Sequence, residues 1–308
     1  MNLSDIRFKR TPHRANPSFP SKPGVLKMHP SRLLVFYAFV VWTTVLFACG
    51  TYTGSIKRRS LLVTMMKAAG DNLQHDKGVC LMAKKITDTV TWVGKVDWEL
   101  NEFHGHEYLT EKGSSYNAYL IRDKKTVLMD TVWKPYDDEF VENLKKEIDL
   151  HQIDYIVMNH NENDHSGALP ALMAAIPDTP IYCTKKGEAI LRGLYHKDWN
   201  FVNVKTGDTL DLGTHQLIFI EAPMLHWPDT MFTYMTGENI LFSNDGFGQH
   251  FASEDLFNDQ ADQAALYGEA MKYYANILNL YSPMVTRKID EILAMNCLLY
   301  TSPSPRDS

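Results

Sequence analysis

The chain has 308 residues, a formal net charge of −6 and a hydrophobic content of 44%. This length allows one large domain or two small ones, and the hydrophobic content is sufficient for a real core. Among residues 82–308, Cys183 is the only cysteine before the extreme C-terminus, which excludes a disulfide framework and predicts a reduced, cytoplasmic protein. We expect no nucleic-acid partner.

Charge divides the chain into two parts. Residues 1–81 contain 12 Lys/Arg against 3 Asp/Glu, whereas residues 82–308 contain 19 against 34. Residues 33–56 carry no charge, and LLVFYAFVVWTTVLFACG within them has the length of a membrane span. Three interpretations remain: a signal or membrane anchor, another targeting extension, or translated upstream sequence before a true start at Met82. We favour the last, because strand periodicity begins directly after Met82.

The last twelve residues, CLLYTSPSPRDS (297–308), match neither the period nor a cap of the helix expected before them. The string resembles a translated sequencing adapter, so we treat it as a scar and leave it out of the fold prediction. The predicted organisation is therefore a basic extension (1–81), one folded domain that is incomplete at its C-terminus (82–296), and a scar (297–308).

Strands and helices alternate along the predicted domain. The pattern predicts hairpins over residues 114–132, 202–222 and 231–243, the second with turns at 205–208 and 213–214. Single strands are expected at residues 153–158 and 181–183, and helices at 136–148, 167–176, 186–195, 260–279 and 285–295. Strand-rich runs with interleaved helices favour an α/β (α+β) fold, in which two packed sheets have helices outside them.

Metal-ligand side chains follow three of the expected strands. The segment NHNENDHSGAL (159–169) supplies the first four of them, and two later strands end near the others: His160, Glu162, Asp164, His165, His226 and Asp245. Imidazole and carboxylate groups hold divalent metals, and six of them from three loops are enough for two ions. A single histidine is more often a core or surface residue, but six ligand-type residues at strand ends indicate a dinuclear site.

The order H-x-E-x-D-H, a later His and a final Asp resembles the flavodiiron proteins of the metallo-β-lactamase fold. The similarity covers about residues 86–296 and includes WVGKVDW, EFHG, GSSYNAYLI, DYIVMNHNENDHSGALP, PMLHWPDTM, LFSNDGFGQH and YYANIL. The resemblance implies an αββα sandwich with two iron ions at its edge. It also implies that His160, Glu162 and His226 bind one iron, that Asp164 and His165 bind the other, and that Asp245 bridges them.

Glu162 distinguishes redox from hydrolytic chemistry. Hydrolytic relatives of the fold usually have histidine at this position, and a nitrogen-rich site suits zinc, which has no redox chemistry. A carboxylate adds negative charge and a hard oxygen ligand, which favours iron and stabilises its oxidised state. The alternative functions are a dinuclear zinc hydrolase, such as a thioesterase, and a non-catalytic product tethered through residues 33–56.

Two further residues fall where the family places groups over its diatomic pocket. His104 in EFHG and Tyr273 in KYYANIL are there expected to hydrogen-bond a ligand or to supply protons. For Tyr273, ordinary packing is the competing interpretation. Trp227 is expected to form a pocket wall. His196, His215 and His250 have no partners by spacing, and we expect them on the surface or in loops.

The resemblance implies reduction of O2 to water or of NO to N2O. Its further implications are FMN in a flavodoxin-like domain after this one, a head-to-tail homodimer, and rubredoxin or a similar electron donor. No flavin motif is present in the 308 residues, and the family's last histidine on the second iron is also missing. The chain as written is therefore expected to have an incomplete second metal site and to be inactive alone.

Overall fold

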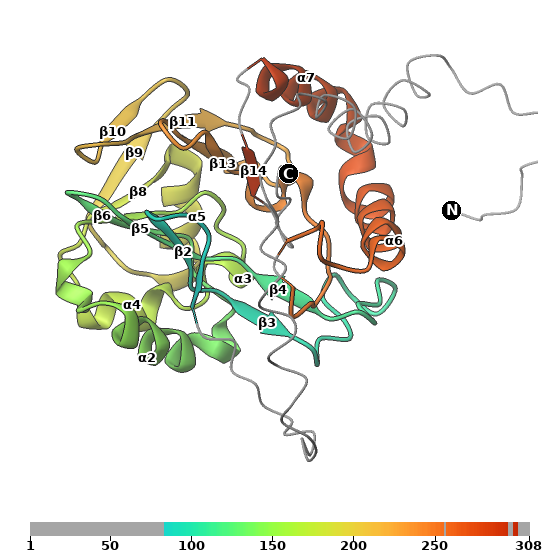
Figure 1. The fold of residues 1–308 in the computed structure, drawn as a ribbon, viewed down its shortest axis with the longest axis horizontal. Coiled ribbons are helices and arrows are strands. Elements are labelled where there is room, and N and C mark those ends of the chain that lie inside the picture. Colours follow the sequence, from blue (N-terminus) through green and yellow to red (C-terminus); the bar gives the residue numbers. More distant parts are fainter. Residues whose placement is uncertain (1–82, 256, 295–297, 301–308) are drawn as a thin grey trace, which may run out of the picture. The chain divides into compact units, whose positions relative to one another are not determined.

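The computed structural model describes residues 83–255, 257–294 and 298–300 (Figure 1). The hydrophobic segment 33–56, Met82 and most of residues 297–308 lie outside the described residues. Within the described part, no helix combines the length and the apolarity that a membrane crossing requires.

The first sheet has seven strands in the order β1-β2-β5-β6-β7-β8-β9. Its strands are β1 (Lys84–Lys85), β2 (Val90–Trp92), β5 (Tyr119–Arg122), β6 (Thr126–Met129), β7 (Tyr155–Val157), β8 (Ile181–Thr184) and β9 (Phe201–Val204). The β1, β2, β5 and β6 strands pair antiparallel, and β6 to β9 pair parallel. Parallel pairing requires crossovers, which contain α2 (Asp137–Glu147), α3 (Asn163–Ser166), α4 (Leu169–Ala175) and α5 (Lys185–Tyr195).

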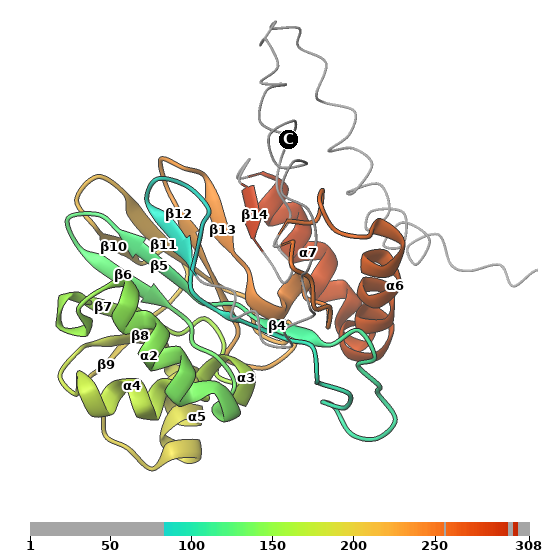
Figure 2. The ribbon, with the colours of Figure 1, turned by 60° about the horizontal axis from the view of Figure 1, so that its bottom comes forward.

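The second sheet has the order β10-β11-β12-β13-β14. Its strands are β10 (Thr209–Asp211), β11 (Gln216–Glu221), β12 (Met231–Met235), β13 (Ile240–Phe242) and β14 (Leu298–Tyr300). A separate pair is formed by β3 (Lys95–Asp97) and β4 (Ser114–Tyr116). Two helices, α6 (Gln263–Tyr273) and α7 (Ser282–Leu293), lie between β13 and β14 in the chain. Figure 2 shows α2, α4 and α5 beside the first sheet, and α7 beside the second.

Side-chain alternation builds two apolar layers. In β6, Val127 and Met129 belong to a cluster that also contains Phe219 and Phe242 of the second sheet. Leu128, between them in sequence, belongs to a second cluster with side chains of α2 and α4. Successive strand residues point to opposite faces, so one face of the first sheet packs on the second sheet and the other packs on helices. The predicted αββα sandwich is confirmed.

The helices agree with the expected ranges to within a few residues, apart from two regions. The helix expected at 167–176 is α4, and a short helix that the pattern did not predict, α3, precedes it. The helix expected at 260–279 leaves α-geometry after Tyr273, with a π-helical turn (Tyr274–Leu278) and a 3-10 turn (Asn279–Tyr281).

One predicted hairpin is wrong. The turn at residues 205–208 joins β9 to β10, but these strands belong to different sheets, so the turn carries the chain across the sandwich. The turn at 213–214 does join a hairpin, β10 to β11. Turn chemistry is local and indicates that the chain reverses, whereas sheet membership is decided by long-range pairing. In the second sheet, β14 pairs parallel with β13, so three of the residues omitted from the fold prediction join that sheet.

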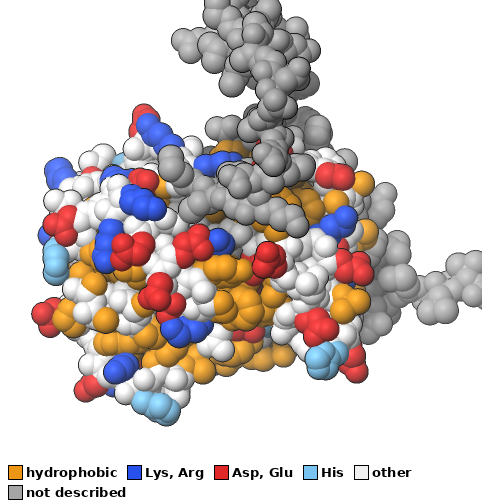
Figure 3. Space-filling view, turned by 90° about the horizontal axis from the view of Figure 1, so that it is seen from below, with side chains coloured by type: hydrophobic (Ala, Val, Ile, Leu, Met, Phe, Trp, Pro, Cys, Tyr) orange, Lys and Arg blue, Asp and Glu red, His pale blue; other side chains and the backbone are white. Residues whose placement is uncertain are grey.

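Figure 3 shows a face on which acidic and basic side chains are interspersed among hydrophobic ones. A surface of this kind produces no strong single-signed field across that face.

We expect Phe219→Ala to destabilise the fold strongly. Phe219 has 0% exposure and stacks on Tyr182 of the first sheet, with ring centroids 6.1 Å apart. Truncation of a buried aromatic ring leaves a cavity and costs about 3–5 kcal/mol. Urea unfolding measures the change, and Leu280→Ala is the control, because Leu280 is 83% exposed and its truncation should change stability by at most about 0.5 kcal/mol. Equal losses for the two variants would contradict this packing.

Candidate metal centre

Three segments bring the six predicted residues to one edge of the sandwich. His160 and Glu162 lie in the loop after β7, and Asp164 and His165 lie in α3. His226 lies between β11 and β12, and Asp245 lies in a 3-10 turn (Asn244–Phe247) after β13. The six residues form two groups, each with donor atoms within 4.8 Å of one another: His160, Glu162, His226 and Asp245 in the first, and Asp164, His165 and Asp245 in the second.

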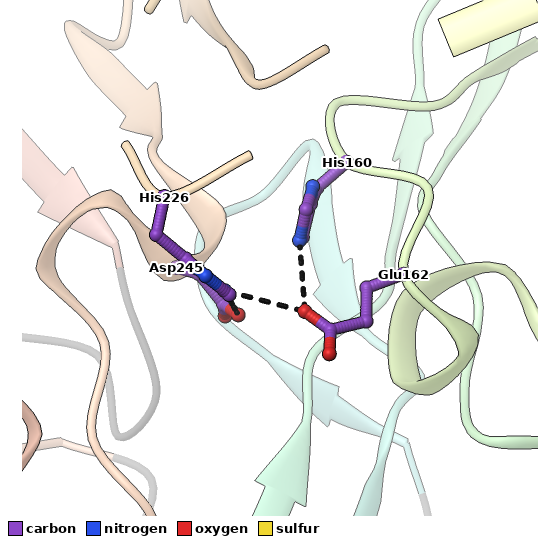
Figure 4. A group of neighbouring side chains, drawn as sticks. All are labelled: His160, Glu162, His226 and Asp245. Atoms are coloured by element: carbon purple, nitrogen blue, oxygen red, sulfur yellow. Dashed lines mark hydrogen bonds and ion pairs between the residues drawn. The ribbon is translucent and has the colours of Figure 1, made fainter. Parts of the chain in front are cut away.

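Glu162 lies between two imidazoles of the first group. Its Oε2 atom is 3.4 Å from His160 Nε2 and 3.2 Å from His226 Nε2, and Figure 4 shows both contacts. Asp245 belongs to both groups: its Oδ2 is 3.4 Å from His226 Nε2, and its Oδ1 is 3.0 Å from His165 Nε2. In the second group, Asp164 Oδ2 is 3.3 Å from His165 Nε2.

These distances fit ligands of a common ion. Two atoms that are each about 2.1 Å from one ion, at bond angles of about 90–110°, are about 3.0–3.5 Å apart. His226 Nε2 and His165 Nε2 are buried and form no aligned hydrogen bond among the described residues, although carboxylate oxygens lie within this range. Nitrogen and oxygen atoms that converge on one point without forming hydrogen bonds to one another fit a bound metal better than a hydrogen-bond network. The residues present therefore fit a divalent cation in each group.

Electrostatics makes the cluster strongly attractive to cations. Burial opposes ionisation of Glu162, but contacts from His160 and His226 outweigh burial and lower its pKa to about 2. Burial likewise opposes the charge on His160, but Asp229 and Glu162 raise its pKa to about 10. The pKa of Asp245 is held well below its usual value, because the His165 and His226 contacts overcome its burial. Without a metal, Glu162 and Asp245 are thus ionised and His160 is protonated.

The end of β6 holds the ligand loop in place. Asp130 accepts hydrogen bonds from the backbone N–H and from Nδ2 of Asn159, at 2.7 and 2.9 Å. Thr131 donates to the His165 carbonyl through its N–H and its hydroxyl, at 2.8 and 2.7 Å. Asp130 has a φ of 55°, which is uncommon for a residue with a side chain. The contacts of Asp130 depend on long-range pairing, so no local sequence pattern reveals them.

Asn159 also joins the two sheets immediately before His160. Its Oδ1 atom accepts a hydrogen bond from the Thr233 hydroxyl at 2.6 Å, and its carbonyl accepts one from the Met231 N–H at 2.9 Å. Both partners lie in β12, whereas Asp130 follows β6. One amide side chain therefore fixes the ligand loop to both sheets.

His104 and Tyr273 both lie beside the cluster. The His104 ring centroid is 6.1 Å from that of His226, and the Tyr273 centroid is 6.3 Å from it. Burial lowers the pKa of His104, although the nearby carboxylates partly oppose this. Burial, assisted by the charge of Asp245, raises the pKa of Tyr273 far above its usual value. Both side chains are therefore neutral groups next to charged ones, and their catalytic roles remain predictions.

His250 lies in a loop, as expected, but it is buried, and the expectation that it lacks partners is wrong. Its Nε2 is 3.0 Å from His104 Nε2, and its Nδ1 is 2.9 Å from the Ser114 hydroxyl. Burial, with the proximity of His104, lowers the pKa of His250 to about 4. His250 is 146 residues from His104 and 136 residues from Ser114 in the chain, so spacing contained no signal for these contacts.

The other two histidines have different outcomes. His215 is half-buried and its Nδ1 is 2.9 Å from Asp123 Oδ2, so the prediction that it lacks a partner is also wrong. His196 is exposed in a left-handed conformation at the end of α5, as a surface residue should be. Trp227 lies against His160, with ring centroids 5.5 Å apart, as a pocket wall would.

Asp229 is a second residue that sequence reasoning missed. It is buried behind the first group, with its Oδ2 atom 3.5 Å from His160 Nδ1. Asn161 donates to the same oxygen through its backbone N–H at 2.9 Å and its Nδ2 at 2.8 Å. The motif HWPD, which we used as a family marker, contains this aspartate without revealing what it faces.

The αββα layers and the carboxylate-rich cluster at their edge define a protein of the metallo-β-lactamase fold. Residues 115–293, more than half of the chain, match the family described as "ODP family beta lactamase". The chain belongs to this family.

Its relatives are flavorubredoxins and flavodiiron proteins. The chain is 58% identical over 217 residues to an anaerobic nitric oxide reductase flavorubredoxin homolog of Escherichia coli O157:H7, covering 70% of this chain and 53% of that one. The rubredoxin oxygen:oxidoreductase of Desulfovibrio gigas matches with a TM-score of 0.68 and 40% identity, over 71% of this chain and 55% of that chain. The flavodiiron protein of Giardia intestinalis matches with a TM-score of 0.69 and 35% identity, over 73% and 55%. These findings confirm the flavodiiron resemblance, and the chain spans about half the length of the curated relatives it matches.

We expect the affinity for divalent cations to rise with pH. In the metal-free cluster the pKa of His160 is about 10, so below that pH a metal ion must displace its proton. Glu162, with a pKa of about 2, is already ionised and releases none. One displaced proton raises the apparent affinity about tenfold per pH unit. Calorimetric titration at about pH 6 and pH 8, in buffers that differ in ionisation enthalpy, measures both affinity and proton release. Affinity that is independent of pH would contradict these protonation states.

Proposed function

We propose that this domain is the diiron catalytic domain of a nitric oxide or oxygen reductase. The observation that carries the proposal is the position of Glu162, whose carboxylate oxygen lies 3.2–3.4 Å from two imidazole nitrogens in the first group. A hard, negatively charged oxygen at this place favours iron over zinc and stabilises its oxidised state. The names of the relatives support the same chemistry.

The proposed ligand assignment follows the two groups. His160, Glu162 and His226 hold one ion, Asp164 and His165 hold the other, and Asp245 contributes one oxygen to each. The assignment is supported by Asp245, whose two oxygens face imidazoles of different groups. Three carboxylates in all give a donor set rich in oxygen, which a dinuclear hydrolytic zinc site does not require.

The chemistry that the ion pair would supply when bound is electron transfer: one electron from each ferrous ion for the reduction of two NO molecules to N2O and water, or two of the four electrons for the reduction of O2 to water, with the other two delivered through FMN. The reduction of NO also consumes two protons. His104 and Tyr273, neutral and beside the cluster, are the proposed hydrogen-bond donors to the substrate. His250 contacts the His104 ring through their Nε2 atoms, which lie 3.0 Å apart, and so restricts the rotation of that ring beside the cluster.

The electron route is proposed from the relatives. The words flavorubredoxin, flavodiiron and rubredoxin in their names support FMN as the mediator and a rubredoxin-like protein as the donor. We place the FMN in a flavodoxin-like domain outside this chain, and propose a head-to-tail homodimer that brings it to the irons of the partner. A cytoplasmic location, and a domain bounded by residues 82 and 296, belong to the same proposal.

A zinc hydrolase is the second candidate, because the same fold and five of the six side chains also suit hydrolytic sites. The two functions differ in the metal they need. An iron-loaded protein that consumes NO or O2 supports the first, and a zinc-loaded protein that cleaves a thioester supports the second.

The test is a single turnover with NO. The chain is loaded anaerobically with Fe2+ and freed of unbound iron, and N2O is measured by gas chromatography after addition of NO, so that no flavin or external reductant is needed. We expect N2O from the iron-loaded protein, because two ferrous ions hold the two electrons that one turnover needs. The inactivity expected of the chain alone applies to repeated turnover, which requires an electron donor. Glu162→His should lower the yield by at least about tenfold, because partners outside the ligand set already affect metal sites by about 10–100-fold.

Glu142→His is the matched control, because the Glu142 side chain is 66% exposed in α2 and faces no ligand. Its N2O yield should equal that of the unaltered protein. Absence of N2O and of O2 consumption with iron, together with thioester hydrolysis by the zinc-loaded protein, would overturn the proposal in favour of the hydrolase.

A further inference from the structure

Asp229 is a buried carboxylate that no part of the proposed reaction uses. Its side chain has 0% exposure, and it lies three residues after His226 on the same loop. A carboxylate removed from water is costly unless hydrogen bonds and opposite charge compensate it. Asn161 provides two N–H groups to Oδ2, and the remaining charged neighbour is the imidazole of His160.

The two nitrogens of His160 face different environments. Nε2 faces Glu162 at 3.4 Å, within the group of four residues that fits a metal. Nδ1 lies 3.5 Å from Asp229 Oδ2 on the opposite side of the ring, as an ion-pair contact without an aligned hydrogen bond. An ionised carboxylate accepts hydrogen bonds and cannot donate them, so it favours a proton on Nδ1 and leaves the lone pair on Nε2. That tautomer directs the lone pair at the metal position.

Asp229 is itself held firmly. Both donors of Asn161 reach one oxygen, and the Asp229 carbonyl accepts a hydrogen bond from the Thr184 hydroxyl at 3.1 Å. A Cβ atom on Gly187 would lie only 2.6 Å from Asn161 Nδ2, so α5 packs closely against the amide. The carboxylate therefore links the loop that carries His226 to the loop that carries His160, and the first turn of α5 supports both.

We propose that Asp229 is a positioning residue for metal binding. It fixes His160 as the tautomer protonated at Nδ1, orients its ring, and makes Nε2 a stronger donor to the ion in the first group. The role agrees with a general property of metal-binding histidines, whose second nitrogen usually donates to a carboxylate or carbonyl. The inference rests on the proposed metal centre, but it requires neither NO nor O2 chemistry.

Charge gives a second reason for a carboxylate at this place. The ligands Glu162, Asp164 and Asp245 supply three negative charges, whereas two divalent ions carry four positive ones. Asp229 provides the fourth negative charge without occupying a coordination position. An amide at position 229 would preserve the shape and lose this compensation.

The experiment measures the affinity of the chain for Zn2+ and Fe2+ by chelator competition. Asp229→Asn is expected to weaken binding about 10–100-fold. The matched control is Asp123→Asn. Asp123 also pairs with an imidazole, His215, at 2.9 Å, but it lies in the turn between β5 and β6, at the opposite edge of the sheet from the ligand loop. Its substitution should leave the affinity unchanged.

A double-mutant cycle separates positioning from a general structural effect. In a His160→Gln background, Asp229→Asn should cause no further loss of affinity, because the ring on which it acts is gone. An equal loss in both backgrounds, or unchanged affinity in Asp229→Asn alone, would overturn the proposal.

Nitrogen NMR of the unaltered, zinc-loaded protein provides a measurement that needs no variant to fold. We expect the His160 signals of a ring protonated at Nδ1 and bound through Nε2, and binding through Nδ1 would reject the assignment. Metal binding with these properties but without N2O formation would leave Asp229 in place and reject only the proposed reductase function.

Discussion

The structure depends on the burial of carboxylate side chains within 3.0–3.4 Å of imidazole nitrogens, at the edge of two packed sheets. In a medium of low dielectric constant such a cluster is stable only with compensating positive charge. Protons on the histidines supply it in the metal-free state, and divalent ions supply it better, because each can contact several oxygens at once. The scaffold therefore holds the carboxylates of this cluster close together despite their mutual repulsion.

The sandwich holds the cluster by fastening loops to strands of both sheets. Asn159 is the clearest case, because Asp130 and Thr233 bind opposite ends of its amide group. Residues that make no contact with a metal thus decide where His160 and Glu162 lie. Since the anchors come from both sheets, a change in sheet packing is transmitted to the ligand geometry.

The sequence was sufficient to predict the layers of the sandwich and the six clustered residues, because both leave local patterns in the sequence. Alternation in β6 separates Val127 from Leu128, and ligand-type residues follow strand ends. Long-range pairing leaves no such pattern: the turn at 205–208 crosses between sheets, although its composition is that of a hairpin. The contacts of His250 and Asp229 were not predicted for the same reason, since their partners lie 146 and 69 residues away in the chain.

His250 and Asp229, which the sequence did not predict, share a physical role that explains their burial. His250 and His104 stand beside negative side chains, yet burial keeps the pKa of both low, so the pair remains neutral. Neutral imidazoles in contact share one proton between facing nitrogens, which fixes the tautomer of each ring. On His160 the tautomer is selected differently, because the neighbouring group is the charged carboxylate of Asp229 instead of a neutral imidazole. The metal centre is therefore surrounded by groups that fix which imidazole nitrogens carry protons. An imidazole serves as a metal ligand or as a hydrogen-bond donor according to the group that contacts its other nitrogen.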